Sequence, residues 1–228
     1  MTKVLSSAPI MRIFKLKPHL SKLEEFSQIG IENLTTSIEN ETNTLAMYMA
    51  HLPEDNTINY VVEVYKDKEA YEKHIASPQF KKFFDFASNG ISDRAVFQLV
   101  PQLLVEKSQP LYFKNGGDFS IRLAEVEVRE EDVRAFKAIV SHEMKESIAK
   151  EDGVLAMYAG CETDDLRIWM FFEIYQDEES YENHCLTPHF KDYIDKTSQM
   201  LVDKKLTVLT GDCLVNQGGL FFEAKRVN

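Results

Sequence analysis

Apolar and polar residues alternate along the chain in a pattern that occurs twice, about 110 residues apart. Ile10–Lys17 and Phe119–Val128 alternate with a period close to two, which is typical of β-strands. Apolar residues then recur three and four positions apart, from Leu20 to Leu34 and from Val133 to Ile148. This spacing predicts an amphipathic helix in each copy, and the dense charge on its other side indicates a solvent-exposed face.

The second part of each copy predicts a β-hairpin, a broken helix and a last strand. The predicted second strand of the second copy begins at Gly153, the third strands are Ile58–Tyr65 and Ile168–Tyr175, and the fourth strands are Arg94–Val105 and Lys204–Val215. The polar stretches Pro53–Thr57 and Glu162–Asp165 are the predicted hairpin loops. Asp67 and Asp177 stand where helix N-caps belong, and Pro78 and Pro188 end one helix and begin the next.

The two copies are related by a constant offset of 110 positions. Leu45-Ala46-Met47-Tyr48 recurs as Leu155-Ala156-Met157-Tyr158, and 18 of the 44 positions from Leu45 to Ser88 match their partners. A repeat this regular indicates a duplicated domain. We therefore expect one domain over residues 1–113 and a second over 114–228, joined by a linker at 107–118.

Each copy has the order β-α-β-β-α-β, which predicts a ferredoxin-like α+β unit with helices on one face of an antiparallel sheet. The other sheet face would be apolar and bare, so we expect the two sheets to pack together as a pseudo-twofold α+β barrel inside one chain. Short apolar stretches follow each copy, at Leu111–Phe113 and Leu220–Phe222. We expect them to form tail strands that cross onto the other unit.

Composition narrows the possible partners. The net charge of −11 argues against nucleic acid, because phosphate binding needs a basic face. No stretch approaches the 18 apolar residues typical of a membrane span, and the N-terminal stretch is too interrupted for a secretory signal. Cys161, Cys185 and Cys213 are odd in number and fit no disulfide framework. A cytoplasmic protein is expected.

The stretch Phe172-Glu173-Ile174-Tyr175-Gln176-Asp177, followed by Tyr181-Glu182-Asn183-His184 and Thr187-Pro188-His189-Phe190-Lys191, resembles the antibiotic biosynthesis monooxygenase domain family. It is most similar to the branch of quinol monooxygenases and autoinducer-2-degrading proteins. The first copy resembles the family through Val62–Asp67, Tyr71–His74 and Ser77–Lys81. The resemblance implies a dimeric α+β barrel, here built within one chain; whether two such chains associate further stays open.

The resemblance also implies a chemistry. Some members oxidise quinols or anthrones with dioxygen and use neither flavin nor metal, because an electron-rich phenolate can itself reduce oxygen. We therefore expect no cofactor, no metal, and a small aromatic or quinol-like substrate together with dioxygen. A haem-degrading branch uses a histidine that is replaced here by Phe84 and Ile194. Haem degradation is accordingly disfavoured.

All but one of the candidate catalytic residues recur in both copies. They are His184, His189, Glu173 and Tyr175 in the second copy and His74, Glu63 and Tyr65 in the first. A carboxylate among aromatic residues could be a base with a raised pKa, although Glu63 and Glu173 could equally pair with Arg12 and Arg122. Histidine can transfer protons near neutrality, but it can also cap a helix end. The candidate substrate-binding residues are Trp169, Arg122 and Arg12.

Two differences between the copies favour the second as the reactive one. His189 is matched by Gln79, and Trp169 by Asn59. The favoured hypothesis is a cofactor-independent monooxygenase acting on a small quinol or phenol. The alternatives are an isomerase or degrader of a small oxygenated metabolite, and a barrel that binds a ligand without catalysis.

Overall fold

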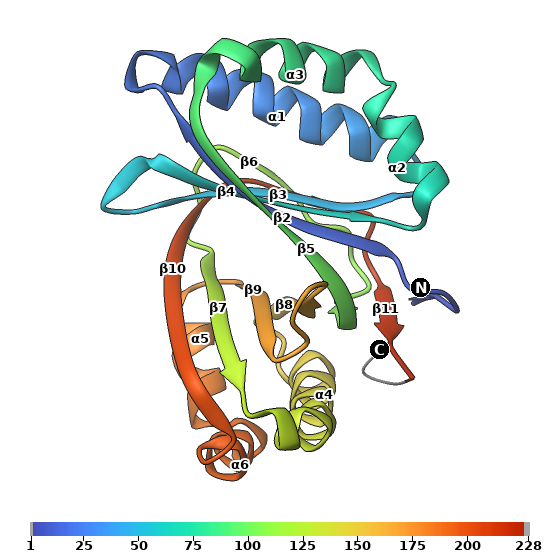
Figure 1. Cartoon of the computed structure of the whole chain (residues 1–228), viewed down its shortest axis with the longest axis vertical. Coiled ribbons are helices and arrows are strands. Elements are labelled where there is room, and N and C mark those ends of the chain that lie inside the picture. Colours follow the sequence, from blue (N-terminus) through green and yellow to red (C-terminus); the bar gives the residue numbers. More distant parts are fainter. Residues whose placement is uncertain (1, 226–228) are drawn as a thin grey trace.

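The computed structural model describes residues 2–225, and its elements repeat with the period of the sequence (Figure 1). The first unit contains β1 (Lys3–Val4), β2 (Ile10–Pro18), α1 (Leu23–Asn40), β3 (Thr44–Leu52), β4 (Asp55–Tyr65), α2 (Lys68–Ile75), α3 (Pro78–Gly90) and β5 (Ile91–Glu106). After β6 (Tyr112–Lys114), the second contains β7 (Ser120–Val128), α4 (Val133–Lys150), β8 (Val154–Glu162), β9 (Ile168–Tyr175), α5 (Glu178–Leu186), α6 (Pro188–Thr197), β10 (Leu201–Asn216) and β11 (Leu220–Glu223). Short 3₁₀ turns, Leu20–Lys22 and Glu130–Asp132, precede α1 and α4.

The break in the second helix of each unit comes from local chemistry. The Asp177 carboxylate accepts a hydrogen bond from the Ser180 backbone N–H at 2.7 Å, and so caps the start of α5. Thr187 caps α6 in the same way, and Pro188 occupies its first turn, where a missing N–H costs nothing. Asp67, Ser77 and Pro78 repeat this arrangement in the first unit.

Eight strands close into an antiparallel barrel. The order around it is β5-β2-β4-β3-β10-β7-β9-β8, and β8 pairs with β5 again. β5 and β10 are 16 residues long and belong to both sheets. The first half of each pairs within its own unit, while the second half pairs with β8 or β3 of the other unit.

The two junctions share one register, as expected for a pseudo-twofold axis. Leu104 is opposite Tyr158 where β5 meets β8, and Leu214 is opposite Tyr48 where β10 meets β3. The tail strands also cross over: β6 pairs with β10, and β11 pairs with β5. The predicted ferredoxin-like units, the intramolecular barrel and the crossing tails are confirmed.

The hydrophobic core has three layers. One cluster, which includes Ile13, Val62 and Phe172, fills the barrel, and the other two lie between each sheet and its helices. Figure 1 shows α1–α3 at one end of the molecule and α4–α6 at the other, with the barrel strands between them. The sheet faces that point into the barrel thus stabilise each other, while each unit packs its helices on the other face of its own sheet.

A polar chain crosses the barrel interior at the pseudo-twofold axis. The Asn216 side-chain amide donates to the Tyr48 hydroxyl at 2.8 Å, and this hydroxyl lies 2.9 Å from that of Tyr158. Tyr158 in turn donates to Glu106, whose other oxygen accepts from the Leu220 backbone N–H at 3.1 Å. Glu106 and Asn216 are themselves 110 residues apart. The two ends of this hydrogen-bonded chain are therefore equivalent positions in the two units, but only one end carries a carboxylate.

Some boundaries differ from the sequence prediction. β4 begins at Asp55, inside the predicted loop, because the Asp55 carboxylate binds the backbone N–H and hydroxyl of Thr57 and tightens the turn. β5 and β10 begin at Ile91 and Leu201, three residues earlier than predicted. Within residues 2–225, no helix combines the length and the apolar character needed to span a bilayer.

Candidate functional site

The second unit has a partly open cavity of about 110 Å³ between its sheet and helices α4, α5 and α6. Its apolar wall includes Val140 of α4, Phe171 of β9 and Phe190 of α6. Its polar wall includes Glu143, Glu173, Tyr181, His184 and Tyr193. Polar groups that can exchange protons therefore face a small, mainly apolar space.

Glu173 and Tyr175 lie two residues apart on β9 and so face the same side of the sheet. The Tyr175 hydroxyl donates to Glu173 Oε2 at 2.9 Å. Burial raises the pKa of Glu173 above its ordinary value, and it outweighs the opposing effects of nearby His184, Tyr175 and Arg122. Tyr175 packs against the His184 ring with the centroids 5.3 Å apart, so it supports the cavity wall from behind.

His184 and His189 meet at one carboxylate. His184 Nδ1 lies 3.0 Å and His189 Nε2 lies 2.7 Å from Glu151 Oε1, just beyond the end of α4. Burial alone would raise the pKa of Glu151, but the two imidazole hydrogen bonds outweigh it and hold the pKa below its ordinary value. The chain His184–Glu151–His189 therefore leads from the cavity wall to His189, whose side chain is 11% exposed.

Glu143 of α4 is a cavity residue that the sequence analysis did not identify. It is buried, and its Oε1 accepts a hydrogen bond from the Ser147 hydroxyl at 2.6 Å. Burial raises the pKa of Glu143 to about 8, assisted by the negative charges of Glu173 and Glu151. Its spacing from Val140 and Ser147 places Glu143 on the inward face of the helix. This spacing is the one sequence feature that could have identified it as a cavity residue.

The candidate substrate-binding residues do not reach this cavity. Trp169 is buried against Phe136, with ring centroids 5.2 Å apart, and it belongs to the core. Arg122 is opposite Glu173 in the sheet, but it donates instead to Glu178 at 2.6 Å and stacks over Tyr181 at 3.9 Å. Stacking on the ring draws the guanidinium away from Glu173, so the expected ion pair does not form.

The first unit keeps part of this arrangement. Tyr65 donates to Glu63 at 2.8 Å, and burial raises the pKa of Glu63. His74 Nδ1 lies 3.2 Å from Glu41, the counterpart of Glu151. Arg12 stacks over the Tyr71 ring at 4.1 Å, as Arg122 does over Tyr181.

Two substitutions around the paired histidine distinguish the two units. Asn33 stands where the second unit has Glu143, and Gln79 stands where it has His189. Gln79 Nε2 donates to Glu41 Oε1 at 2.7 Å, so glutamine makes the hydrogen bond that histidine makes in the second unit. The first unit therefore has neither the helix carboxylate nor the second histidine.

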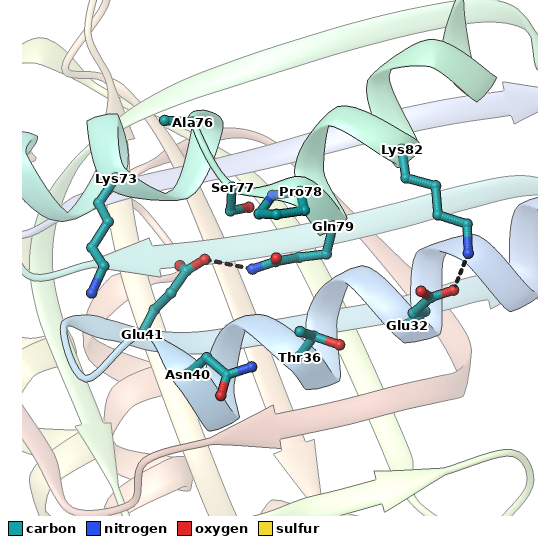
Figure 2. A pocket seen from close by; sticks show the side chains of 10 residues that line it. All are labelled: Glu32, Thr36, Asn40, Glu41, Lys73, Ala76, Ser77, Pro78, Gln79 and Lys82. Atoms are coloured by element: carbon teal, nitrogen blue, oxygen red, sulfur yellow. Dashed lines mark hydrogen bonds and ion pairs between the residues drawn. The ribbon is translucent and has the colours of Figure 1, made fainter.

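A larger hollow on the first unit is an open groove of about 680 Å³ between α1 and the α2–α3 turn. Figure 2 shows the Gln79–Glu41 hydrogen bond joining its two sides and the ion pair of Lys82 with Glu32 at one end. The side chains around it are mainly polar, and Glu63 and Tyr65 do not contribute to its lining. Two glutamates, Glu143 and Glu173, and a mainly apolar wall come together in the second unit's cavity, which is therefore the stronger candidate site.

Comparisons with known proteins agree with this architecture. A protein from Lactobacillus acidophilus NCFM, described as a "putative monooxygenase", is 31% identical, with a TM-score of 0.89 over 94% of this chain and 99% of that one. A second so described, from Fusobacterium nucleatum, is 23% identical, with a TM-score of 0.87 over 96% of this chain and 100% of that one. An anthrone oxidase-like protein shares the fold at 11% identity, with a TM-score of 0.54 and 93% of each chain covered. No curated protein has a significant match.

The family pattern itself is present twice. The sequence pattern described as "Antibiotic biosynthesis monooxygenase" (ABM) matches residues 9–85 and again residues 120–196. Each match spans the first strand, the first helix, the hairpin and most of the broken helix of one unit. The chain therefore belongs to the antibiotic biosynthesis monooxygenase domain family, with two copies of the domain in one polypeptide.

Proposed function

We propose that the second unit oxidises a small quinol or phenol with dioxygen, inside its cavity and without an organic or metal cofactor. Membership of the ABM family and the similarity to proteins named as monooxygenases support a monooxygenase-like function. The observation that carries the finer proposal is the pair Glu143 and Glu173. Both carboxylates have raised pKa values and face a small cavity lined by aromatic rings, beside a histidine.

The cavity's size limits the substrate. A cavity of 110 Å³ is smaller than the roughly 150 Å³ engineered cavity that accepts benzene. We therefore expect a single aromatic ring, bound with a small adjustment of side chains such as Phe190 or Tyr193, and we expect tricyclic anthrones to be excluded. The apolar wall would hold the ring, and the carboxylates would meet its hydroxyl groups.

The proposed reaction begins with removal of a phenolic proton. Glu143 in its ionised form takes this proton, because a base with a pKa near the working pH is effective in proton transfer. The phenolate passes one electron to dioxygen, and the resulting superoxide and phenoxyl radical combine at a ring carbon to form a peroxide. Loss of water, made from the distal oxygen, the hydrogen of that ring carbon and the proton first taken by Glu143, leaves the proximal oxygen on the ring, so a phenol gives a quinone and a quinol gives a hydroxylated quinone. One dioxygen is consumed and one water is formed for each quinol.

The proton taken from the phenol must be held and then returned to the peroxide within each turnover, and the histidine chain gives it a route to and from solvent. His184 faces the cavity, Glu151 links it to His189, and His189 is partly exposed. Imidazole can accept a proton on one nitrogen and release it from the other. The first unit has Gln79 at the last position, and an amide cannot carry a proton in this way.

Oxygen consumption tests the proposal. The chelator-treated protein is incubated with a panel of monocyclic quinols, catechols and phenols, and with anthrone as a bulky comparison. We expect uptake above the buffer rate with at least one monocyclic compound and none with anthrone. If no compound raises the rate, the proposed oxidation is wrong. Conversion that continues under anaerobic conditions would instead favour the isomerase alternative.

A further inference from the structure

Three side chains of the second unit form a cluster of the kind that binds transition metals. Glu143, His184 and His189 each offer one oxygen or nitrogen, and these atoms all lie within 4.8 Å of one another. Glu143 and His184 are buried, and His189 is partly exposed. They come from α4, α5 and α6, so the fold brings them together from separate elements.

The hydrogen bonds of the cluster leave acceptors facing one another. His184 Nδ1 is 3.0 Å from Glu151 Oε1, which assigns the proton of the neutral ring to this nitrogen. The lone pair of His184 Nε2 then faces Glu143 Oε1 at 3.6 Å, beyond hydrogen-bond distance. Two acceptors facing each other attract a cation between them. A carboxylate that fixes the outer nitrogen of a ligating histidine is also a common feature of metal sites.

The first unit provides an internal comparison. Its residues at the three positions are Asn33, His74 and Gln79, so it has one histidine and no carboxylate. Asn33 Oδ1 and His74 Nε2 are buried and have no hydrogen-bond partner among the described residues. The duplicated scaffold thus positions polar atoms inward at these places in both units, but only the second unit supplies the ligand types that bind transition metals strongly.

We propose that the second unit binds one divalent first-row transition metal ion through Glu143, His184 and His189. Two imidazoles and one carboxylate suit Zn²⁺, Co²⁺ or Fe²⁺, whereas Mg²⁺ and Ca²⁺ prefer oxygen ligands. Glu151 is a positioning residue that holds both rings by hydrogen bonds. Solvent or a small molecule in the adjoining cavity completes the coordination of the ion.

This inference does not depend on the proposed oxidation. If that oxidation takes place, a bound metal ion occupies the Glu143 carboxylate that would accept the phenolic proton. Zn²⁺ therefore inhibits the oxidation. Faster oxidation with Fe²⁺ would overturn the cofactor-independent mechanism and leave the metal site in place. Failure of every quinol to react would likewise leave the binding measurement unaffected.

Calorimetric titration of the full chain, freed of metal by a chelator, tests the site. We expect one Zn²⁺ per chain with a Kd tighter than about 10 µM, and no comparable heat with Mg²⁺. Bound Co²⁺ should show the visible absorption of a site with few nitrogen and oxygen ligands. Fe²⁺, added without oxygen, should displace Co²⁺ and reduce this absorption. Absence of Zn²⁺ binding at about 100 µM would overturn the proposal.

Variants taken from the first unit locate the site. Glu143→Asn and His189→Gln introduce the residues that the first unit has at these positions, and each should weaken Zn²⁺ binding by more than about 100-fold, because each removes a ligand itself rather than its supporting partner. Glu151→Gln should weaken it by about 10- to 100-fold. His142→Gln, at an exposed histidine of α4, should bind as the wild type does. Unchanged affinity in both ligand variants, with folding verified by circular dichroism, would show that the ion binds elsewhere and refute the site.

Discussion

The substitution Glu106→Gln tests the polar chain inside the barrel. Glu106 is buried at the end of β5, where one oxygen accepts from Tyr158 and the other from the Leu220 backbone N–H. Burial raises the pKa of Glu106 from 4.5 to about 7, although both hydrogen bonds act in the opposite direction. The folded chain therefore holds a proton here that the unfolded chain releases at lower pH.

The magnitude follows from the two pKa values. The pKa of Glu106 rises from 4.5 to about 7 on folding, and each unit of difference corresponds to about 1.4 kcal/mol. The protonated Glu106 therefore contributes about 3 kcal/mol to the free energy of unfolding. Because the folded pKa is the higher one, this contribution to stability is fully present below pH 4.5 and is lost as the pH rises to about 7. Glutamine does not titrate, so the variant lacks this loss. Its amide N–H₂ would face a donor, which costs about 1–3 kcal/mol at every pH.

Urea unfolding at several pH values, followed by the fluorescence of the single tryptophan, measures the effect. Trp169 is 1% exposed in the folded chain, so unfolding changes its environment strongly. We expect the free energy of unfolding of the variant, relative to the wild type, to rise by about 3 kcal/mol between pH 4.5 and 8. Glu54→Gln, at an exposed loop position, should follow the wild type throughout. Parallel curves for Glu106→Gln and the wild type would refute the reasoning.

Three further predictions concern the cavity and the junction. For a substrate found in the quinol panel, kcat/KM should rise with pH and level off above about 8, the pKa of Glu143. Glu143→Gln should lower kcat/KM at least about 100-fold. A kcat/KM that falls with rising pH would contradict the role of Glu143 as a base. His189→Gln should leave Tm unchanged, because Gln79 makes the same hydrogen bond in the first unit, but it should lower kcat, with partial recovery in imidazole buffer; an unchanged kcat would exclude the proton route. Tyr48→Phe breaks the hydroxyl chain to Tyr158 and should lower the free energy of unfolding by about 1–3 kcal/mol in urea titrations; no loss would mean that the chain contributes little.

The duplication made the fold predictable. Both copies had to form the same elements, so a strand that is weakly patterned in one copy was supported by the other, as Ile10–Lys17 was by Phe119–Val128. The bare sheet face then required an internal partner. The sequence did not reveal that β5 and β10 would each extend into the other sheet. That pairing depends on the register of Leu104 with Tyr158, which only tertiary contacts determine.

The site was predictable only in part. Glu173 and His184 recur with the repeat, and they do line one cavity. Glu143 was missed because its counterpart is Asn33 and because a glutamate on a highly charged helix looks like a surface residue. Trp169 drew attention as an unmatched aromatic, but it packs against Phe136 in the core. Glu143 reaches the cavity and Trp169 does not because of how α4 and α6 pack on the sheet. Local sequence does not specify that packing.

The central claim is that the second cavity oxidises a quinol and that the first unit does not. The most direct measurement is oxygen uptake with the best monocyclic quinol in the wild type, Glu143→Gln and Asn33→Ala. Asn33 is the first-unit counterpart of Glu143, and its side-chain oxygen has no hydrogen-bond partner among the described residues, so its removal breaks no such bond there. We predict one dioxygen per quinol in the wild type and in Asn33→Ala, and almost none in Glu143→Gln. Equal uptake in all three proteins would contradict the assignment of the second cavity as the active site.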